Sequence, residues 1–199
     1  MQATDIRSRL NVPWHHGDVV DLSGVTVAGR LDLSGLDLTG VDFTGARFPD
    51  GIDAEGACFM GLCWFRDVEI GGPANFDGAR FMNDARFETA RFDGPVSFSG
   101  AEFRGIGRFD AVSAKAGANF ERTVAYGNVS FAGLSAAGRL SFAGSEWLGG
   151  LWCDRAELPG DTDFLDTQVH GRLWVRGARR GNAPLGADAF SMCFGYTYA

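Results

Sequence analysis

The sequence has little lysine, little histidine and no long apolar run, and each shortage argues against a class of protein. Lys115 is the only lysine, and the formal net charge is −7. Non-specific binding of nucleic acid requires clustered lysine and arginine to neutralise phosphates. No apolar run approaches the roughly 18 residues of a membrane-spanning helix. We therefore expect neither direct nucleic-acid binding nor a membrane-embedded chain, and the arginine-rich, lysine-poor composition indicates a GC-rich bacterial genome.

The four cysteines form no CxxC motif, and the beginning of the chain, MQATDIRSRL, lacks the apolar stretch of a secretory signal. We expect a cytoplasmic protein on these grounds. By the phase of the repeat described below, Cys58 points outward and Cys63 inward, so they should not form a disulfide. Cys153 takes a core position as a small hydrophobe, and Cys193 lies in the tail.

Glycine and phenylalanine are over-represented, at 29 and 17 residues. Phenylalanine recurs at alternating steps of six and five residues, at Phe81, Phe87, Phe92, Phe98 and Phe103. This period does not match the 3.6 residues of a helical turn, and a glycine in nearly every period would cost a helix about 1 kcal/mol each. The pattern excludes a helix.

Each repeat reads as a very short strand followed by a turn. Two residues before each large residue stands a small or apolar one, such as Ala79 or Ala85, and the residue between them is polar. Glycine often follows two residues later and supplies the turn. A three-sided solenoid would use uniform six-residue sides and a narrow Ile- and Val-rich interior. Alternating sides of five and six residues predict a four-sided coil instead.

In a four-sided coil the phenylalanines form ladders that fill the interior. One ladder contains Phe43, Phe65, Phe87, Phe109 and Phe131, and the opposite one contains Phe76, Phe98, Phe120, Phe142 and Phe164. A flanking row holds Phe59, Phe81 and Phe103, followed by Ala125 and Trp147.

The segments VDLSG, LDLSG, LDLTG and VDFTG carry a resemblance to a known family. The chain resembles the pentapeptide-repeat family over about residues 20–180, although it inserts an extra residue at alternate corners. The resemblance implies an all-β fold, a right-handed quadrilateral β-helix of about seven coils, roughly 35 Å long at the usual strand spacing.

The ends of such a solenoid need caps. We expect residues 1–19 to form the N-terminal cap through Ile6, Leu10, Val12 and Trp14. Residues 181–199 are expected to form a C-terminal cap or dimerisation segment. Within them the tail AFSMCFGYTYA alternates apolar positions and is predicted to form a strand that either covers the last coil or pairs with a second chain as a homodimer. The alternating residues are Phe190, Met192, Phe194, Tyr196 and Tyr198.

The outward positions give the candidate binding residues. Residues 1–70 hold 11 acidic and five basic residues, so the acidic excess lies near the N-terminus. These acids are either solvating groups or a surface for a partner that expects negative charge, and the tryptophans either bind a partner or are covered by a cap. One side presents Asp21, Asp42, Trp64, Arg86, Arg108, Ser130, Trp152 and Trp174, and neighbouring sides add Asp32, Asp53 and Asp37.

Residues suited to catalysis are few. His15, His16 and Asp18 could hold a metal, but three adjacent ligands without a distant partner are more typical of a polar loop. His170 stands beside a turn glycine and is expected to be exposed, with no acid or nucleophile in register. No serine-histidine-acid arrangement or phosphate loop stands out. We expect no enzyme activity, no cofactor and no metal, and a small enzyme at the N-terminal cap is the least favoured alternative.

The resemblance also implies a function. The best-known pentapeptide-repeat proteins bind type II DNA topoisomerases as acidic mimics of duplex DNA and protect DNA gyrase from poisons, which makes gyrase a candidate partner. Against this, Arg80, Arg86, Arg91 and Arg108 interrupt the acidic surface in the middle of the rod. The alternative is a scaffold that binds an unknown protein through the side that carries tryptophan and arginine.

Overall fold

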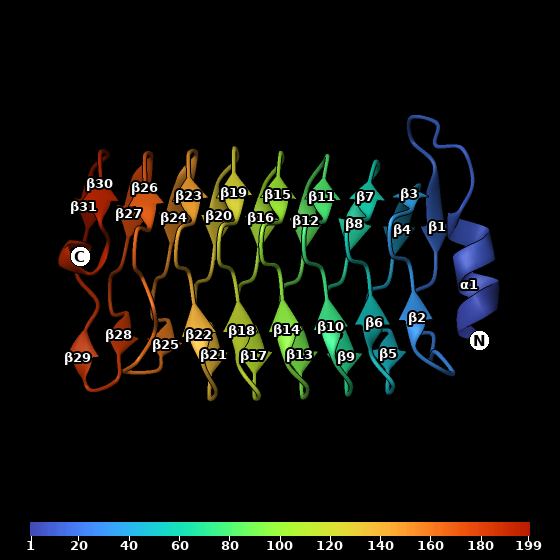
Figure 1. Cartoon of the computed structure of the whole chain (residues 1–199), viewed down its shortest axis with the longest axis horizontal. Coiled ribbons are helices and arrows are strands. Elements are labelled where there is room, and N and C mark those ends of the chain that lie inside the picture. The colour runs from blue at the N-terminus through green and yellow to red at the C-terminus, as the bar shows by residue number, and fades with distance from the viewer.

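A computed structural model describes all 199 residues, and it is a four-sided coil of short parallel strands with one helix at its N-terminal end (Figure 1). The predicted all-β, four-sided β-helix is confirmed. The four sheets are called faces 1 to 4, in the order in which the chain visits them. They contain nine, eight, six and eight strands, so the rod has about eight turns, one more than expected.

Strands pair in parallel with their equivalents in adjacent coils, except for one antiparallel strand at the C-terminal end, and most strands are two residues long. Face 1 contains β1 (Val19–Asp21), β4 (Gly40–Asp42), β8 (Cys63–Trp64), β12 (Ala85–Arg86), β16 (Gly107–Arg108), β20 (Val129–Ser130), β24 (Gly150–Trp152), β27 (Arg172–Trp174) and β31 (Thr197–Tyr198). Face 2 contains β5 (Arg47–Phe48), β9 (Glu69–Ile70), β13 (Arg91–Phe92), β17 (Ser113–Ala114), β21 (Ser135–Ala136), β25 (Glu157–Leu158), β28 (Arg179–Arg180) and the antiparallel β29 (Ala183–Pro184).

The other two sheets complete the coil. Face 3 contains β2 (Leu31–Asp32), β6 (Ile52–Asp53), β10 (Ala74–Asn75), β14 (Val96–Ser97), β18 (Ala118–Asn119) and β22 (Leu140–Ser141). Face 4 contains β3 (Asp37–Leu38), β7 (Cys58–Phe59), β11 (Arg80–Phe81), β15 (Glu102–Phe103), β19 (Val124–Ala125), β23 (Glu146–Trp147), β26 (Gln168–Val169) and β30 (Met192–Cys193).

The interior is a lattice of phenylalanine rings. Along one ladder Phe87 stacks on Phe109 with ring centroids 5.0 Å apart, and along the opposite ladder Phe98 stacks on Phe120 at 5.2 Å. Across the interior Phe87 meets Phe98 edge to face at 5.3 Å and 85°. Aromatic pairs favour both of these arrangements. The predicted ladders are confirmed, and the rings fill the space between the four faces.

Each longer side carries its extra residue at a corner, either between faces 4 and 1 or between faces 2 and 3. Gly105, Gly127, Gly149 and Gly171 stack directly upon one another at the corner between faces 4 and 1. A methyl group added at Gly127 would lie 2.2 Å from the carbonyl oxygen of Gly105, closer than real side-chain contacts. At Gly127 the close approach of the neighbouring coil therefore leaves no room for a side chain.

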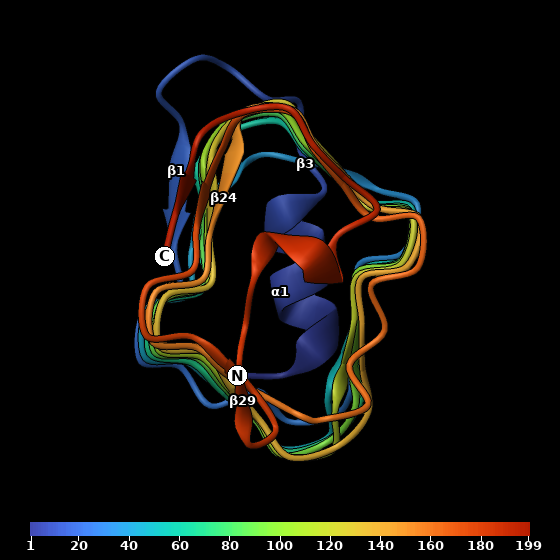
Figure 2. The same cartoon turned by 90° about the vertical axis from the view of Figure 1, so that its left-hand side faces the viewer.

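The N-terminal end is capped by α1 (Ala3–Leu10), which lies across the four-sided cross-section (Figure 2). Its Ile6 and Leu10 are fully buried, as expected. Trp14 is half-buried, but Val12 is 43% exposed, so its predicted part in the cap is wrong. Val12 lies beyond the end of the helix, in the loop that leads to β1.

The C-terminal segment continues the coil and is not the single strand that we predicted. The 3-10 helix η1 (Ala187–Ala189) brings Phe190 onto Phe164 with ring centroids 4.8 Å apart, and β30 and β31 then pair with β26 and β27. The tail thus covers the last coil. Phe194 and Tyr196 stay 66% and 79% exposed, and pairing with a second chain remains a prediction.

We expect Gly127→Ala to lower the free energy of unfolding by about 1–3 kcal/mol, because the added methyl group has no room beside the next coil. Urea unfolding followed by circular dichroism measures this change. Gly160→Ala is the matched control, since its added methyl group would lie 3.8 Å from the nearest atom. Equal stability of the two variants would contradict the steric account of the corner.

Candidate binding surfaces

Face 1 carries the candidate tryptophans and arginines in register. Trp64 pairs with Arg86, and Trp152 pairs with Trp174, on adjacent strands. All three tryptophan side chains are half-buried. The face therefore carries indole rings towards both of its ends, with Arg108 exposed between Trp64 and Trp152.

The tail covers one of these tryptophans. The ring of Tyr198 stacks on that of Trp174, with centroids 4.0 Å apart and planes 13° apart. Trp174 is thus packed within the chain. Of the two alternatives for the tryptophans, binding a partner or being covered by a cap, the second holds for Trp174. The indole Nε1 of Trp174 is buried without a hydrogen-bond partner.

A hollow of about 320 Å³ brings Arg108 and Trp152 together, with Ser130 between them. Its remaining lining includes Ile106, which is 39% exposed. Asp110 orders the polar side of this hollow. Its Oδ2 lies 3.3 Å from Nη1 of Arg108, and its Oδ1 accepts a hydrogen bond from the Ser130 hydroxyl. The hollow offers a partner an indole, a methyl-rich rim and a positioned guanidinium.

Two of the four arginines that interrupt the acidic surface have a carboxylate partner. Nε of Arg86 lies 2.7 Å from Oε1 of Glu88, and Arg108 pairs with Asp110 on the corresponding corner. Arg86 and Arg108 therefore interrupt the acidic surface less than the sequence suggests, whereas Arg80 and Arg91 have no such partner.

The predicted acidic residues are spread over three faces. Asp21 and Asp42 lie on face 1, Asp32 and Asp53 on face 3, and Asp37 on face 4. Four of them also hold the fold together, because each accepts a hydrogen bond from the backbone N–H two residues later. These are the corner aspartates: Asp21, Asp32, Asp42 and Asp53.

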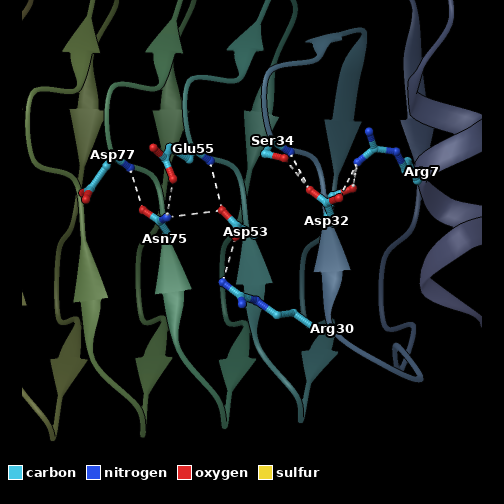
Figure 3. Close-up of polar contacts among 8 residues, drawn as sticks. All are labelled: Arg7, Arg30, Asp32, Ser34, Asp53, Glu55, Asn75 and Asp77. Carbon is cyan, nitrogen blue, oxygen red and sulfur yellow. Dashed lines mark hydrogen bonds and ion pairs between the residues drawn. The ribbon is translucent and has the colours of Figure 1, made fainter.

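Figure 3 shows this arrangement on face 3. Oδ1 of Asp32 accepts hydrogen bonds from Ser34 N at 2.9 Å and from Ser34 Oγ at 2.6 Å, and Arg7 lies 3.0 Å from its Oδ2. Oδ2 of Asp53 lies 2.8 Å from Nη2 of Arg30. The sequence contained a signal for these turns that we missed, namely an aspartate two residues before serine or threonine in VDLSG, LDLSG and VDFTG.

Hydrogen bonding lowers the pKa of two of these carboxyls. The side chain and backbone N–H of Ser34 hold the pKa of Asp32 below 3.8, with Arg7 contributing less. The backbone and side chain of Ser23 lower the pKa of Asp21 in the same way. Hydrogen bonds to the charged form favour that form, so these aspartates stay ionised at neutral pH.

Face 3 also holds a trough of about 530 Å³, which we did not predict from the sequence. It arises because the outward residues of successive strands are small and polar: Asn75, Ser97, Asn119 and Ser141. The trough becomes recognisable only when these residues, each about one coil apart in sequence, are stacked by the fold.

The histidines form no metal site. Nδ1 of His15 lies 3.2 Å from Oδ2 of Asp18, while the ring of His16 faces Trp14 edge-on with centroids 6.2 Å apart. No three His, Cys, Asp or Glu side chains gather closely enough to hold an ion. The expected exposure of His170 is wrong, because Phe194 of the tail stacks on its ring at 5.1 Å and leaves it half-buried.

The cysteines are all free thiols, and burial raises the pKa of each. For Cys153, which occupies a core position as expected, burial raises the pKa to about 12. Cys58 lies on an outward position yet is only 4% exposed, because neighbouring side chains cover it. A thiol with a raised pKa is a poor nucleophile.

The only α-helix, α1, is too short and too polar to cross a membrane.

Comparison with known proteins agrees with this geometry. Residues 59–101 match the family described as pentapeptide repeats in nine copies. No curated protein matches the chain. The matched residues span consecutive coils in the middle of the rod, and the same coil geometry continues on both sides of them.

We expect Ser34→Ala to raise the pKa of Asp32 towards 3.8, because two of the bonds that favour the carboxylate involve Ser34. Carbon-13 NMR titration of the carboxyl group measures the shift. The carboxyl of Asp32 has a lower pKa in the folded chain than in the unfolded chain. The stability that Ser34→Ala removes is therefore fully lost above pH 3.8, and the difference from the wild type disappears as the pH falls through the folded pKa. Ser23→Ala is the control, which should raise the pKa of Asp21 and leave that of Asp32 unchanged. An unchanged pKa of Asp32 in Ser34→Ala would contradict the assignment.

Proposed function

Because the chain is a pentapeptide-repeat protein with its interior filled by phenylalanine, we propose that it is a non-enzymatic module that binds other proteins through the outside of the rod. Repeat solenoids offer long, rigid surfaces of this kind. Each coil contributes one outward residue per face, at a spacing of roughly 4.8 Å.

The hollow on face 1 is the observation that favours a docking site there. Protein interfaces are enriched in tryptophan and arginine near their centres. Trp152 and Arg108 meet at this hollow, and the hydrogen bonds of Asp110 hold the polar wall in place. A partner that packs an apolar side chain on Trp152 and brings a hydrogen-bond acceptor to Arg108 would satisfy both walls.

We expect Trp152→Ala to abolish capture of a specific protein that the wild-type chain retains from host extract, as identified by mass spectrometry. The reason is the loss of the apolar wall of the hollow. Tyr126→Ala is the matched control, since Tyr126 is a 52% exposed aromatic that does not line the hollow. Circular dichroism checks that both variants fold, and retention of the same partner by Trp152→Ala would refute this docking site.

A second candidate function is binding to a type II topoisomerase such as DNA gyrase, as an acidic mimic of DNA. The observation that supports it is the row of carboxylates along face 3, which contains Asp32, Asp53, Glu55 and Asp77 (Figure 3). Such a partner implies a bacterial, cytoplasmic protein with a role in antibiotic resistance. The exposed Phe194 and Tyr196 and the open edge of β31 support a homodimer joined at the C-terminal ends.

We expect the wild-type protein to inhibit gyrase supercoiling, or to protect gyrase from a quinolone, at low micromolar concentration. Glu55→Lys should weaken this effect several-fold because it reverses an exposed charge within the acidic row. Glu157→Lys, an equal change on the exposed part of face 2, should not.

The outcome separates the two candidates. No effect of the wild-type protein at high concentration rejects topoisomerase binding and leaves the docking site on face 1 as the proposed function. Sedimentation of the same samples measures the mass in solution and shows whether the rod is one chain or two.

A further inference from the structure

The sheet of face 3 ends earlier than the other three. It has six strands, whereas its neighbours have eight or nine, and it stops at β22 while the other faces continue to the C-terminal end (Figure 1). A single bridge between Ser141 and Asp163 adds one more coil. No strand of this chain follows Asp163 on face 3, so the sheet has an open edge there.

The open edge carries an unused hydrogen-bond donor. In preceding coils Phe120 N–H donates to Ser141 O at 2.8 Å, and Phe142 N–H donates to Asp163 O at 2.7 Å. The equivalent group, Phe164 N–H, has no acceptor, although Phe164 is only 5% exposed. Buried backbone groups are rarely left unpaired.

The chain itself does not supply the next strand. The residues that would lie over the edge instead form η1, and Phe190 packs its ring on Phe164. Between the edge and this helix a hollow of about 570 Å³ remains, lined by Thr162, Asp163 and Phe164 on one side and by Asp188 and Ser191 on the other.

Charge in the hollow favours a basic occupant. Asp161, Asp163 and Asp188 all line it, and none of them lies within ion-pair distance of a basic group. Two arginines also line the hollow: Arg139 lies 3.7 Å from Glu121, and Arg180 lies over the ring of Phe164 at 5.7 Å. The three carboxylates therefore outnumber the guanidiniums, one of which already has a carboxylate partner outside the hollow. Leu165 adds an apolar contact at the rim and is 67% exposed.

We propose that this open edge binds an extended peptide segment of another protein, which adds as the next strand of face 3. A backbone carbonyl of the peptide accepts a hydrogen bond from the free N–H of Phe164, and a lysine or arginine side chain of the peptide lies against Asp163 and Asp188. Strand addition combines main-chain hydrogen bonds for affinity with side-chain pockets for specificity. The site is on a different face from the tryptophan hollow, so either can fail without the other.

The test is a selection of random octapeptides displayed on phage against the immobilised full-length protein. The expected peptides contain lysine or arginine among β-branched or aromatic residues and contain no proline, which would remove backbone donors from an added strand. Enrichment of no sequence, or of acidic or proline-rich sequences, overturns the proposal.

Two measurements on the best synthetic peptide localise its binding. Hydrogen exchange followed by NMR should show Phe164 N–H exchanging fast in the free protein and slowly in the complex. The double variant Asp163→Asn, Asp188→Asn should weaken binding about tenfold, as expected for two partly exposed charge pairs. The Leu165 N–H donates to Oδ1 of Asp163 at 2.9 Å, and the amide oxygen introduced by Asp163→Asn can still accept this bond, so the fold should persist.

The matched control is Glu157→Gln, which removes an exposed charge from face 2 and should leave the affinity unchanged. Binding that the double variant does not weaken, or that leaves the exchange of Phe164 N–H unchanged, places the peptide elsewhere and overturns the proposal.

Discussion

The rest of the structure depends on one match of distances, between the spacing of strands in a sheet and the spacing of stacked aromatic rings. Strands lie roughly 4.8 Å apart, and the stacked phenylalanines lie between 4.7 Å for Phe81 on Phe103 and 5.4 Å for Phe120 on Phe142. A phenylalanine at the same place in every coil therefore satisfies both the sheet and the core. The same close approach of coils leaves no room for a side chain at Gly127, so the ladders and the glycine corner have a common cause.

A filled interior moves all binding to the surface, where the same residues serve the fold and the charge pattern. Asp32 and Asp53 hold their corners through backbone hydrogen bonds and are partly neutralised by Arg7 and Arg30. Counting acidic residues in the sequence thus overstates the charge that a partner meets. What distinguishes one stretch of the rod from another is the exceptions to the repeat: Trp152 beside Arg108, and the small side chains along face 3.

The two ends of the rod differ in how completely the chain covers them. At the N-terminus Ile6 and Leu10 close the core, and α1 lies over the first coil. At the C-terminus the chain covers the core with Phe190 but leaves face 3 one strand short at Phe164. A solenoid whose core is closed while one sheet edge stays open can accept an added strand without unfolding any part of itself.

The sequence by itself determined the fold, the phase of the coils over about residues 20–180 and the identity of their core, because each of these coils repeats the same local pattern and residues such as Phe87 and Phe98 contact their own equivalents. It also located Trp152 and Arg108 on one face. Only the tertiary structure decided which of these residues stay accessible: Tyr198 covers Trp174, Phe194 covers His170, and Asp110 holds Arg108. The open edge at Phe164 lay beyond sequence reasoning for the same physical reason. Local periodicity fixes what each coil does, but the C-terminal segment leaves the repeat, and its path is set by packing against a surface that exists only once the coils are stacked.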